Sequence, residues 1–324
     1  MFNSNRNLLP DCSNPLIAKK SVAIIIWMQS KVIQLLILIV LVTTACSPRT
    51  GDDETSPADS NEYINNVGSD TMVNLALAWA EQYQKDNPQS NLSVSGGGSG
   101  TGIASLINKT TDLANASRKI KSEEIVNAQA NGIEPVEFIV ARDAIAVIVN
   151  PNNPISQLTL QQLSDIYSGK INNWQELGGE DRPIVRLSRE TNSGTHVYFL
   201  EQVLRLGDKN DKTLFSTDTL LLPSSEVIGA EIRSNPNAIG YDGLGYVTPD
   251  MKVVAVTASQ LGDPDFIYPS SETVNDGTYP IARDLYMYTA GEPVGFVKKY
   301  IEWIYTPQAQ EIVSDLGFVP ILAK

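Results

Sequence analysis

A glycine-rich loop followed by an apolar helical pattern places the strongest constraint on how this chain folds. Residues 94–107 read VSGGGSGTGIASLI, with five glycines, two serines and a threonine at residues 95–102. A flexible linker would explain the glycines, but not why Ile103, Leu106 and Ile107 follow at helical spacing. The pattern indicates a loop whose backbone N–H groups and hydroxyls face an anion at a helix N-terminus.

The same order of strand, Gly/Ser/Thr-rich loop and helix start occurs three times. The loops are GSDT at residues 68–71, GGGSGTG at 96–102 and SGT at 193–195. Serine and threonine are ordinary N-caps, so each loop alone also fits simple helix capping. In an open α/β sheet such turns gather at the carboxyl ends of the strands, where ligands bind. Three of them together therefore favour a shared ligand.

Predicted strands alternate with predicted helices, which indicates the α/β class. Strands are expected at residues 91–95, 113–117, 136–150, 184–187, 239–247 and 252–257. Helices are expected at residues 72–83, 101–108, 121–131, 160–174 (with a turn), 294–304 and 308–316, and from Ser193 onward.

Two arginines stand beside these loops. Arg189 lies four residues before Ser193, and its guanidinium fork suits a tetrahedral oxyanion. Arg118 follows Ser117 at the end of a predicted strand. A surface ion pair is the alternative role for either arginine. With the free N–H donors and the positive ends of the helices, these residues predict a site for a small oxyanion.

Composition excludes several other functions. The net charge of −13 gives nucleic acid no general attraction, so we expect no nucleic acid partner. The glycine loop matches neither a P-loop, nor the dinucleotide fingerprint, nor the nucleophile elbow. The single histidine, His196, is expected to be a first-turn helix residue, and one histidine argues against zinc. We expect no catalytic residues, no metal and no cofactor, with a carboxylate-only metal site left open.

Residues 1–45 are expected to be a signal peptide with an upstream segment. Apolar runs at residues 22–28 and 32–42 lead into TTAC, with Cys46 last, which is a secretory pattern. It resembles a bacterial lipoprotein signal, although Thr43 stands where that signal usually has leucine. We expect lipidation at Cys46 and an acidic, disordered tether over residues 46–60.

Reading from Met28 gives a signal of ordinary length, so residues 1–27 are expected to lie upstream of the true start. An uncleaved anchor near residues 22–45 and cleavage to a soluble form are the alternatives. All three place the remainder outside the membrane. Residues 1–45 carry four Lys or Arg and one Asp, so their removal changes the net charge from −13 to −16. Cys12 and Cys46 are the only cysteines, so no disulfide is expected in the exported part.

Six segments together resemble the PstS-type phosphate-binding proteins of bacterial ABC phosphate importers. They are VGSDTM, SGGGSGTGIASLINKTTDLANASRKI, LTLQQLSDIYSGKINNWQELGG, RETNSGT, AIGYDGLGYV and YPIARDLYMYT, and the resemblance covers about residues 61–321. It implies a two-lobed periplasmic-binding-protein-like fold (type II) with a hinge and one phosphate in the interlobe cleft. Lobe I would comprise residues 60–143 and 256–324, and lobe II residues 144–255. It also implies a monomeric exported protein that delivers phosphate to a permease and is not an enzyme.

The resemblance implies a set of phosphate ligands and their neighbours. They are Ser69, Thr71, Met72, Ser99, Gly100, Thr101, Arg189, Ser193, Gly194 and Thr195, and to them we add Asp70, Ser117 and Arg118 as candidate ligands from their positions beside the same loops and strand ends. Better-known members carry an aspartate at the position that Arg118 occupies here. That carboxylate accepts a hydrogen bond from the proton of phosphate and rejects sulfate, which carries no proton. We hypothesise that Asp70 supplies this carboxylate instead.

Other functions stay open from the sequence. The ligand could be sulfate or another oxyanion, and the protein could be a phosphate sensor or adhesion protein that feeds no transporter. A phosphatase would need a nucleophile or a metal cluster, and the sequence offers neither clearly.

Overall fold

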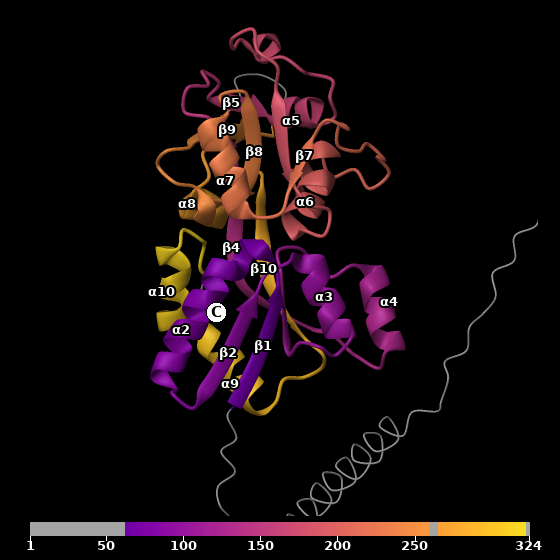
Figure 1. Ribbon diagram of the computed structural model, residues 1–324, viewed down its shortest axis with the longest axis vertical. Coiled ribbons are helices and arrows are strands. Elements are labelled where there is room, and N and C mark those ends of the chain that lie inside the picture. The colour runs from indigo at the N-terminus through magenta and orange to yellow at the C-terminus, as the bar shows by residue number, and fades with distance from the viewer. Residues whose placement is uncertain (1–61, 259–264, 322–324) are drawn as a thin grey trace, which may run out of the picture. The chain divides into compact units, whose positions relative to one another are not determined.

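A computed structural model of the chain describes residues 62–258 and 265–321 (Figure 1). Within them a 10-stranded mixed sheet has the order β2-β1-β3-β10-β4-β8-β6-β7, with β9 paired to β4 and β5 to β9. The strands are β1 (Glu62–Gly68), β2 (Ser90–Ser95), β3 (Leu113–Ala116), β4 (Val136–Val149), β5 (Gln157–Thr159), β6 (Val185–Arg189), β7 (Leu220–Leu222), β8 (Ala238–Gly243), β9 (Lys252–Thr257) and β10 (Ala282–Thr289).

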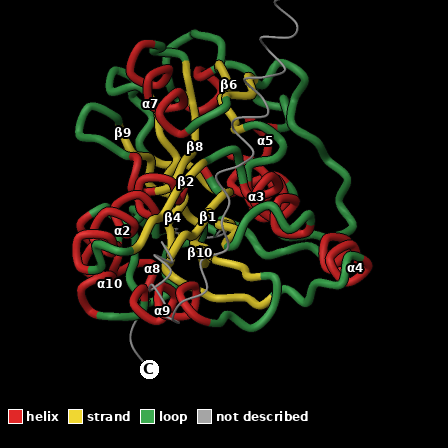
Figure 2. The backbone as a smooth tube through the Cα atoms, turned by 60° about the horizontal axis from the view of Figure 1, so that its bottom comes forward, coloured by secondary structure: helices red, strands yellow, loops and turns green. Residues whose placement is uncertain are grey.

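Helices lie on both sides of these strands (Figure 2). The α-helices are α2 (Val73–Asp86), α3 (Ser99–Ile107), α4 (Ser122–Ala130), α5 (Leu160–Tyr167), α6 (Gly194–Phe199), α7 (Ser225–Ser234), α8 (Ser271–Asn275), α9 (Gly295–Ile304) and α10 (Pro307–Asp315). Short 3-10 turns form η1 (Asp70–Met72), η2 (Trp174–Leu177) and η4 (Leu244–Tyr246), and η3 (Leu200–Leu204) is a π-helical turn after α6.

The long strand β4 takes part in two groups of elements. Its residues 136–144 pair with β10, and its residues 145–149 pair with β8. We call the elements β1–β3, β10, α2–α4, α9 and α10 the first half, and the elements β5–β9 and α5–α8 the second half. The first half occupies the lower part of Figure 1 and contains both the first and the last described elements of the chain.

Each half has a hydrophobic core on both faces of its strands. In the first half, α2, α9 and α10 pack on one face around Trp79 and Tyr300, and α3 packs on the other through Ile103. In the second half, α5 and α6 pack around Phe199, and α7 packs on the opposite face through Ile228. The alternation of strands and amphipathic helices therefore gives the expected α/β fold.

The structure confirms a strand or helix at every predicted segment. The strand predicted at residues 239–247 is shorter than expected, since residues 244–246 turn into η4, and α5 ends at Tyr167. The predicted elements did not include β5, β7, β10, α7 or α8. The predicted signal peptide, the tether and Cys46 lie outside the described residues, and the lobe boundaries stay a prediction. No helix within residues 62–258 and 265–321 is long and apolar enough to cross a membrane.

Helix α5 provides a first prediction, because it begins with a complete capping box. The Thr159 hydroxyl accepts from the Gln162 N–H at 3.0 Å, and the Gln162 side chain accepts from the Thr159 N–H at 2.9 Å. We expect Thr159→Ala to lower the free energy of unfolding by about 1 kcal/mol in urea titration. Thr159→Ser retains the hydroxyl and should lie close to the wild type. Equal loss in both variants would show that the cap is not the cause.

Candidate functional site

The three predicted loops meet where parallel strands end. Gly68 ends β1, Ser95 ends β2 and Arg189 ends β6, and a helix or helical turn begins within a few residues of each. The loops also hold one another. The Gly98 N–H donates to the Gly68 carbonyl at 2.9 Å, and the Gly100 N–H donates to the Asn192 carbonyl at 3.0 Å. The β2–α3 loop of the first half thus contacts the β6–α6 loop of the second.

Four hydroxyls from four different segments converge in this region. The Thr71 and Thr195 Oγ1 atoms are 2.8 Å apart, and the Ser99 and Ser117 Oγ atoms are 3.3 Å apart. The Ser117 N–H also donates to Ser99 Oγ at 3.0 Å. All four side chains are buried. We call Thr71, Ser99, Ser117 and Thr195 the hydroxyl cluster.

Gly194 closes the contact between the two halves at this point. A Cβ atom at this residue would lie 2.4 Å from Ser99 Oγ and 2.5 Å from Ser117 Oγ. Both distances are shorter than real Cβ contacts allow. Only glycine therefore lets the start of α6 approach the hydroxyl cluster this closely.

Arg189 brings a buried guanidinium group to the same region, with a side chain that is 1% exposed. Its Nη2 donates to the Asp70 carboxylate and to the Pro223 carbonyl, and its Nη1 donates to Ser225 Oγ at 2.9 Å. Its Nε is buried and has no hydrogen-bond partner among the described residues. Asp70 lies in the first half and Arg189 in the second, so this ion pair also links the halves.

Two carboxyl groups around Arg189 are shifted by their surroundings. Burial raises the pKa of Asp70, and the positive charge of Arg189 partly offsets the shift. Burial likewise raises the pKa of Asp242 to about 6, again against the effect of Arg189. Ser225 Oγ donates to Asp242 Oδ1 at 2.9 Å, which extends the hydrogen-bond chain from Arg189. Desolvation thus disfavours further negative charge near Arg189 unless a proton accompanies it.

Arg283 and Asp143 complete the buried charges, and the sequence interpretation missed both. Arg283 Nη2 donates to Thr195 Oγ1 at 3.0 Å and to Asp143 Oδ2 at 2.8 Å, while its Nη1 donates to the Ser117 carbonyl at 3.0 Å. Burial raises the pKa of Asp143, with Arg283 opposing the shift. A charged residue inside an otherwise apolar strand sequence, as in VARDAIAVIVN and IARDLYMY, was the available signal.

Several predicted residues lie at the edge of this region. The Met72 N–H donates to the Ser69 carbonyl within η1, and the Met72 side chain is part of the hydrophobic core. The Ser69 hydroxyl is buried and has no partner among the described residues. Thr101 is exposed, and its hydroxyl donates to the Gly97 carbonyl at 2.6 Å. Ser193 caps α6 by accepting from the Thr195 N–H at 3.2 Å, so helix capping does account for this serine.

The structure does not bring the Arg118 guanidinium into the hydroxyl cluster. Its Nη1 and Nη2 donate to the two carboxylate oxygens of Glu124 at 2.8 and 2.6 Å. The ion pair that the sequence allowed as the alternative for this arginine is therefore present, although the Arg118 side chain is only 8% exposed. Its role as a phosphate ligand stays a prediction.

His196 contacts residues of the second half. His196 lies in the first turn of α6. Its Nδ1 is 3.0 Å from Ser188 Oγ, and its ring packs against Phe215. Burial lowers the pKa of His196, which favours a neutral ring. Within residues 62–258 and 265–321, no group of three or more His, Cys, Asp or Glu residues is placed to hold a metal ion.

A fold with two such halves and a polar cluster between them is that of a solute-binding protein, and comparisons with known proteins agree. The model of the PBP superfamily domain matches residues 53–308. The phosphate-binding protein PstS of Pseudomonas aeruginosa is 31% identical over 278 residues, which cover 81% of this chain and 84% of that protein. PstS of Bacillus subtilis is 30% identical over 298 residues, which cover 90% of this chain and 93% of that protein.

A solved structure supports the same relation. A phosphate ABC transporter substrate-binding protein of Clostridium perfringens, crystallised with bound phosphate, is 30% identical and has a TM-score of 0.71. The match covers 81% of this chain and 100% of that chain. The chain belongs to the PstS-type phosphate-binding proteins of the PBP superfamily.

Proposed function

We propose that this protein captures inorganic phosphate outside the cytoplasmic membrane and delivers it to the permease of an ABC transporter. One observation carries the proposal. Two buried arginines, Arg189 and Arg283, reach the meeting point of three helix starts, together with four buried hydroxyls. Positive charge and N–H or O–H donors are what a phosphate ion needs. The family to which the chain belongs consists of binding proteins rather than enzymes.

Phosphate would take the place of the hydrogen bonds that now join the halves. The hydroxyls of Thr71 and Thr195 bond to each other across the two halves, and Arg283 donates to Thr195. Opening the halves frees these donors, and closure around phosphate satisfies them with its oxygens. Each hydrogen bond to a charged group contributes about 1.5–3 kcal/mol net, and about 8 kcal/mol corresponds to a Kd of 1 μM. A few such bonds therefore suffice for micromolar or tighter binding.

Thermal unfolding tests this function. Residues 47–324, stripped of ligand, are heated with phosphate and separately with sulfate. Phosphate at about 100 times its Kd should stabilise the protein by roughly 2.7 kcal/mol and raise its Tm, while sulfate should not. A rise with both anions would make the protein a general oxyanion receptor. No rise with either would leave the loops as helix caps and overturn the proposal.

Asp70 is the proposed discriminator between phosphate and sulfate. Its carboxylate would accept a hydrogen bond from the P–OH group that phosphate carries at neutral pH and sulfate lacks, and burial already raises the pKa of Asp70. We expect Asp70→Asn to lower the ratio of phosphate to sulfate affinity by about tenfold, because the amide can donate to either anion. Asp315→Asn, at an exposed position of α10, is the matched control. An unchanged ratio in Asp70→Asn, measured by calorimetry, would remove Asp70 from this role.

The proposal includes a membrane anchor. Residues 1–45 would direct export, Cys46 would carry the lipid and residues 46–60 would tether the binding part, which we propose acts as a monomer. Labelled palmitate should enter the protein and be lost in Cys46→Ser. Sequencing of the unprocessed precursor decides its start, since a peptide from residues 1–27 would exclude initiation at Met28.

Two other functions separate cleanly from transport. A phosphate sensor or adhesion protein would bind phosphate equally well but would not co-purify with a permease. A phosphatase would turn over a chromogenic phosphate ester, which a binding protein would not.

A further inference from the structure

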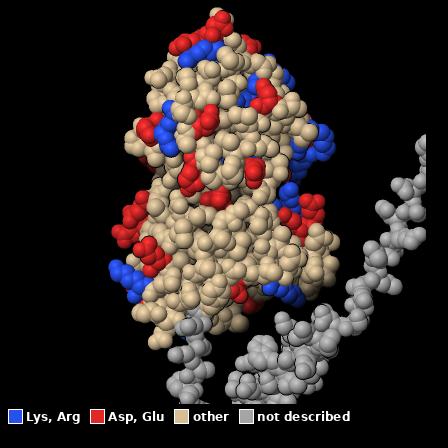
Figure 3. All heavy atoms as spheres, viewed as in Figure 1, with Lys and Arg blue, Asp and Glu red and all other residues tan. Residues whose placement is uncertain are grey.

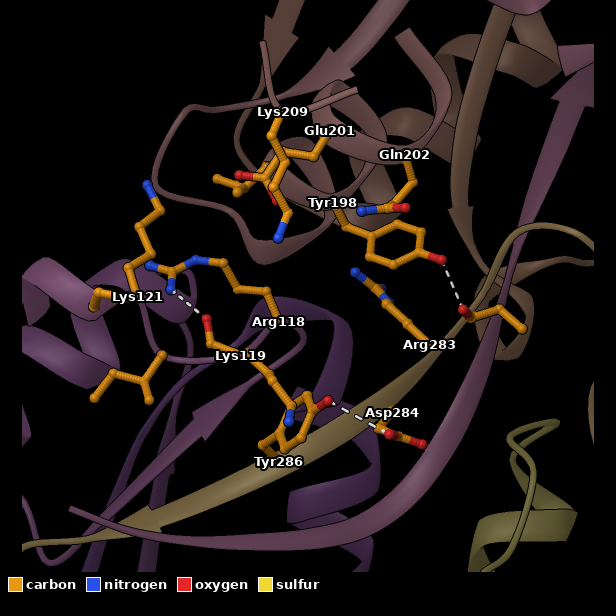
Figure 4. A pocket seen from close by; sticks show the side chains of 14 residues that line it. Arg118, Lys119, Lys121, Tyr198, Glu201, Gln202, Lys209, Arg283, Asp284 and Tyr286 are labelled. Carbon is orange, nitrogen blue, oxygen red and sulfur yellow. Dashed lines mark hydrogen bonds between the residues drawn. The ribbon is translucent and has the colours of Figure 1, made fainter. Parts of the chain in front are cut away.

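A polar pocket lies beside the hydroxyl cluster, between the first and second halves (Figure 4). It has a volume of about 630 Å³. The first half contributes Arg118, Lys119 and Lys121 from the segment between β3 and α4, and Arg283 from β10; the second half contributes Tyr198, Glu201 and Lys209. Of the predicted phosphate ligands, only Arg118 lines it.

Basic side chains outnumber acidic ones in the lining itself, in a protein whose net charge is −13. Five Lys or Arg side chains line the pocket against two acids, Glu201 and Asp284. Glu124 and Asp143 pair closely with the two arginines and offset their charge, whereas Lys119 and Lys121 have only loose pairs with Glu137 and Glu123. Among the described residues, Lys209 is the one cation of the five without an acidic partner. The surface visible in Figure 3 differs in charge from this pocket lining, because acidic side chains gather near the middle of that surface.

The lysines are available to a ligand. Lys119 and Lys121 have only long ion pairs, of 3.6 and 3.9 Å, and both side chains are exposed. Within the described ranges, Lys209 has no carboxylate within 4.0 Å, and Figure 4 shows it extending from the second half toward Arg118. An anion between them would contact cations from both halves.

Arg118, which lines the pocket, also carries a buried donor without a partner. The Arg118 side chain is only 8% exposed. Its Nε has no hydrogen-bond partner among the described residues. Its guanidinium is fixed by Glu124, so this N–H is held in place rather than free to seek water. An unsatisfied buried donor of a charged group is costly, and an anionic acceptor would satisfy it.

We infer that this pocket is a second anion-binding site, which takes a small molecule that carries phosphoryl groups and is larger than orthophosphate. The volume lies within the range of small-molecule sites, and Tyr198 and Tyr286 add aromatic surface to the cationic lining. The loosely paired Lys119 and Lys121 and the unpaired Lys209 reach one cavity from both halves, which suits a ligand with more than one anionic oxygen to share among them. Inorganic diphosphate and a phosphomonoester share this chemistry.

Calorimetry on the purified protein, saturated with orthophosphate, tests the inference. Diphosphate and glycerol 3-phosphate are titrated separately, and at least one should still bind. The double variant Lys121→Gln/Lys209→Gln should weaken that binding by about tenfold or more, because it removes two charged hydrogen-bond donors from the anion. Lys170→Gln/Lys298→Gln makes the same charge change at exposed positions that do not line the pocket and should leave it unchanged.

The outcomes divide as follows. Binding of diphosphate alone identifies an inorganic ligand, and binding of the ester identifies an organic one; both support the site. Binding that disappears when orthophosphate saturates the protein would show a single site and overturn the inference. So would binding that is unaffected in the lysine variant, or no binding of either compound. The inference takes the binding of orthophosphate from the proposed function, and failure of orthophosphate to bind would show separately in the preceding thermal test.

Discussion

Replacing Arg189 with alanine is expected to lower phosphate affinity by at least about a thousandfold. The guanidinium is buried, pairs with Asp70 and leads through Ser225 to Asp242. Truncating one member of a buried charge pair costs about 2–5 kcal/mol, and each charged hydrogen bond lost to the ligand costs about 1.5–3 kcal/mol more. A thousandfold change corresponds to about 4 kcal/mol, so calorimetric titration should detect no binding at micromolar protein concentration.

Folding must be separated from binding in this variant, because the change removes the ion-pair partner of the half-buried Asp70 and the positive charge near the buried Asp242. Arg189→Lys keeps the positive charge but loses the fork, so it should fold and show an intermediate loss of affinity. Arg233→Ala removes a half-exposed surface arginine on α7 and should bind phosphate as the wild type does. Phosphate affinity within tenfold of the wild type in a folded Arg189→Ala protein would exclude Arg189 as a ligand.

Gly194→Ala is expected to weaken phosphate binding by about five- to 150-fold. The added methyl would lie 2.4 Å from Ser99 Oγ and 2.5 Å from Ser117 Oγ, so the halves could not close as they do here. Overpacking of this kind costs about 1–3 kcal/mol, and the cost falls on the closed form alone. The free energy of unfolding of the open protein should change little, because the backbone of Gly194 is at the start of a helix and needs no left-handed conformation.

Gly291→Ala is the matched control for this variant. A Cβ atom at Gly291 meets no other atom within 4 Å, and its φ is not in the left-handed region. It should bind phosphate with unchanged affinity. If Gly194→Ala also bound with unchanged affinity, the contact between Gly194 and the hydroxyl cluster would have no part in closure.

The fold was predictable where the hydrophobic period was regular. Strand β9 was predicted with its observed bounds, residues 252–257, because β-branched residues dominate it. Strand β10 was missed, since Arg283 and Asp284 interrupt its apolar residues and hide the alternation. Strand β7 consists of three residues and its Leu220 and Leu221 are exposed, so it exists through its pairing with β6 rather than through a local pattern.

Some residues of the candidate site could likewise be predicted from local patterns, whereas others could not. Thr71, Ser99 and Thr195 follow glycine-containing turns, and these local signals placed them correctly at helix starts. Arg283 and Asp143 lie directly opposite each other in the antiparallel pairing of β10 and β4, 140 residues apart in the chain. Only the register of two distant strands brings them together, and a single sequence does not contain that register. The ion pair between Asp70 and Arg189 joins η1 to the end of β6, which do not pair in the sheet, so no local pattern indicated it either.

Equilibrium dialysis with labelled phosphate tests the central claim most directly. The protein, stripped of ligand, is dialysed against increasing phosphate, with excess unlabelled sulfate in a parallel series. The account predicts one phosphate bound per chain with a Kd of about 1 μM or lower, and sulfate that does not displace it. Absence of retained phosphate at that concentration, or full displacement by sulfate, would contradict it.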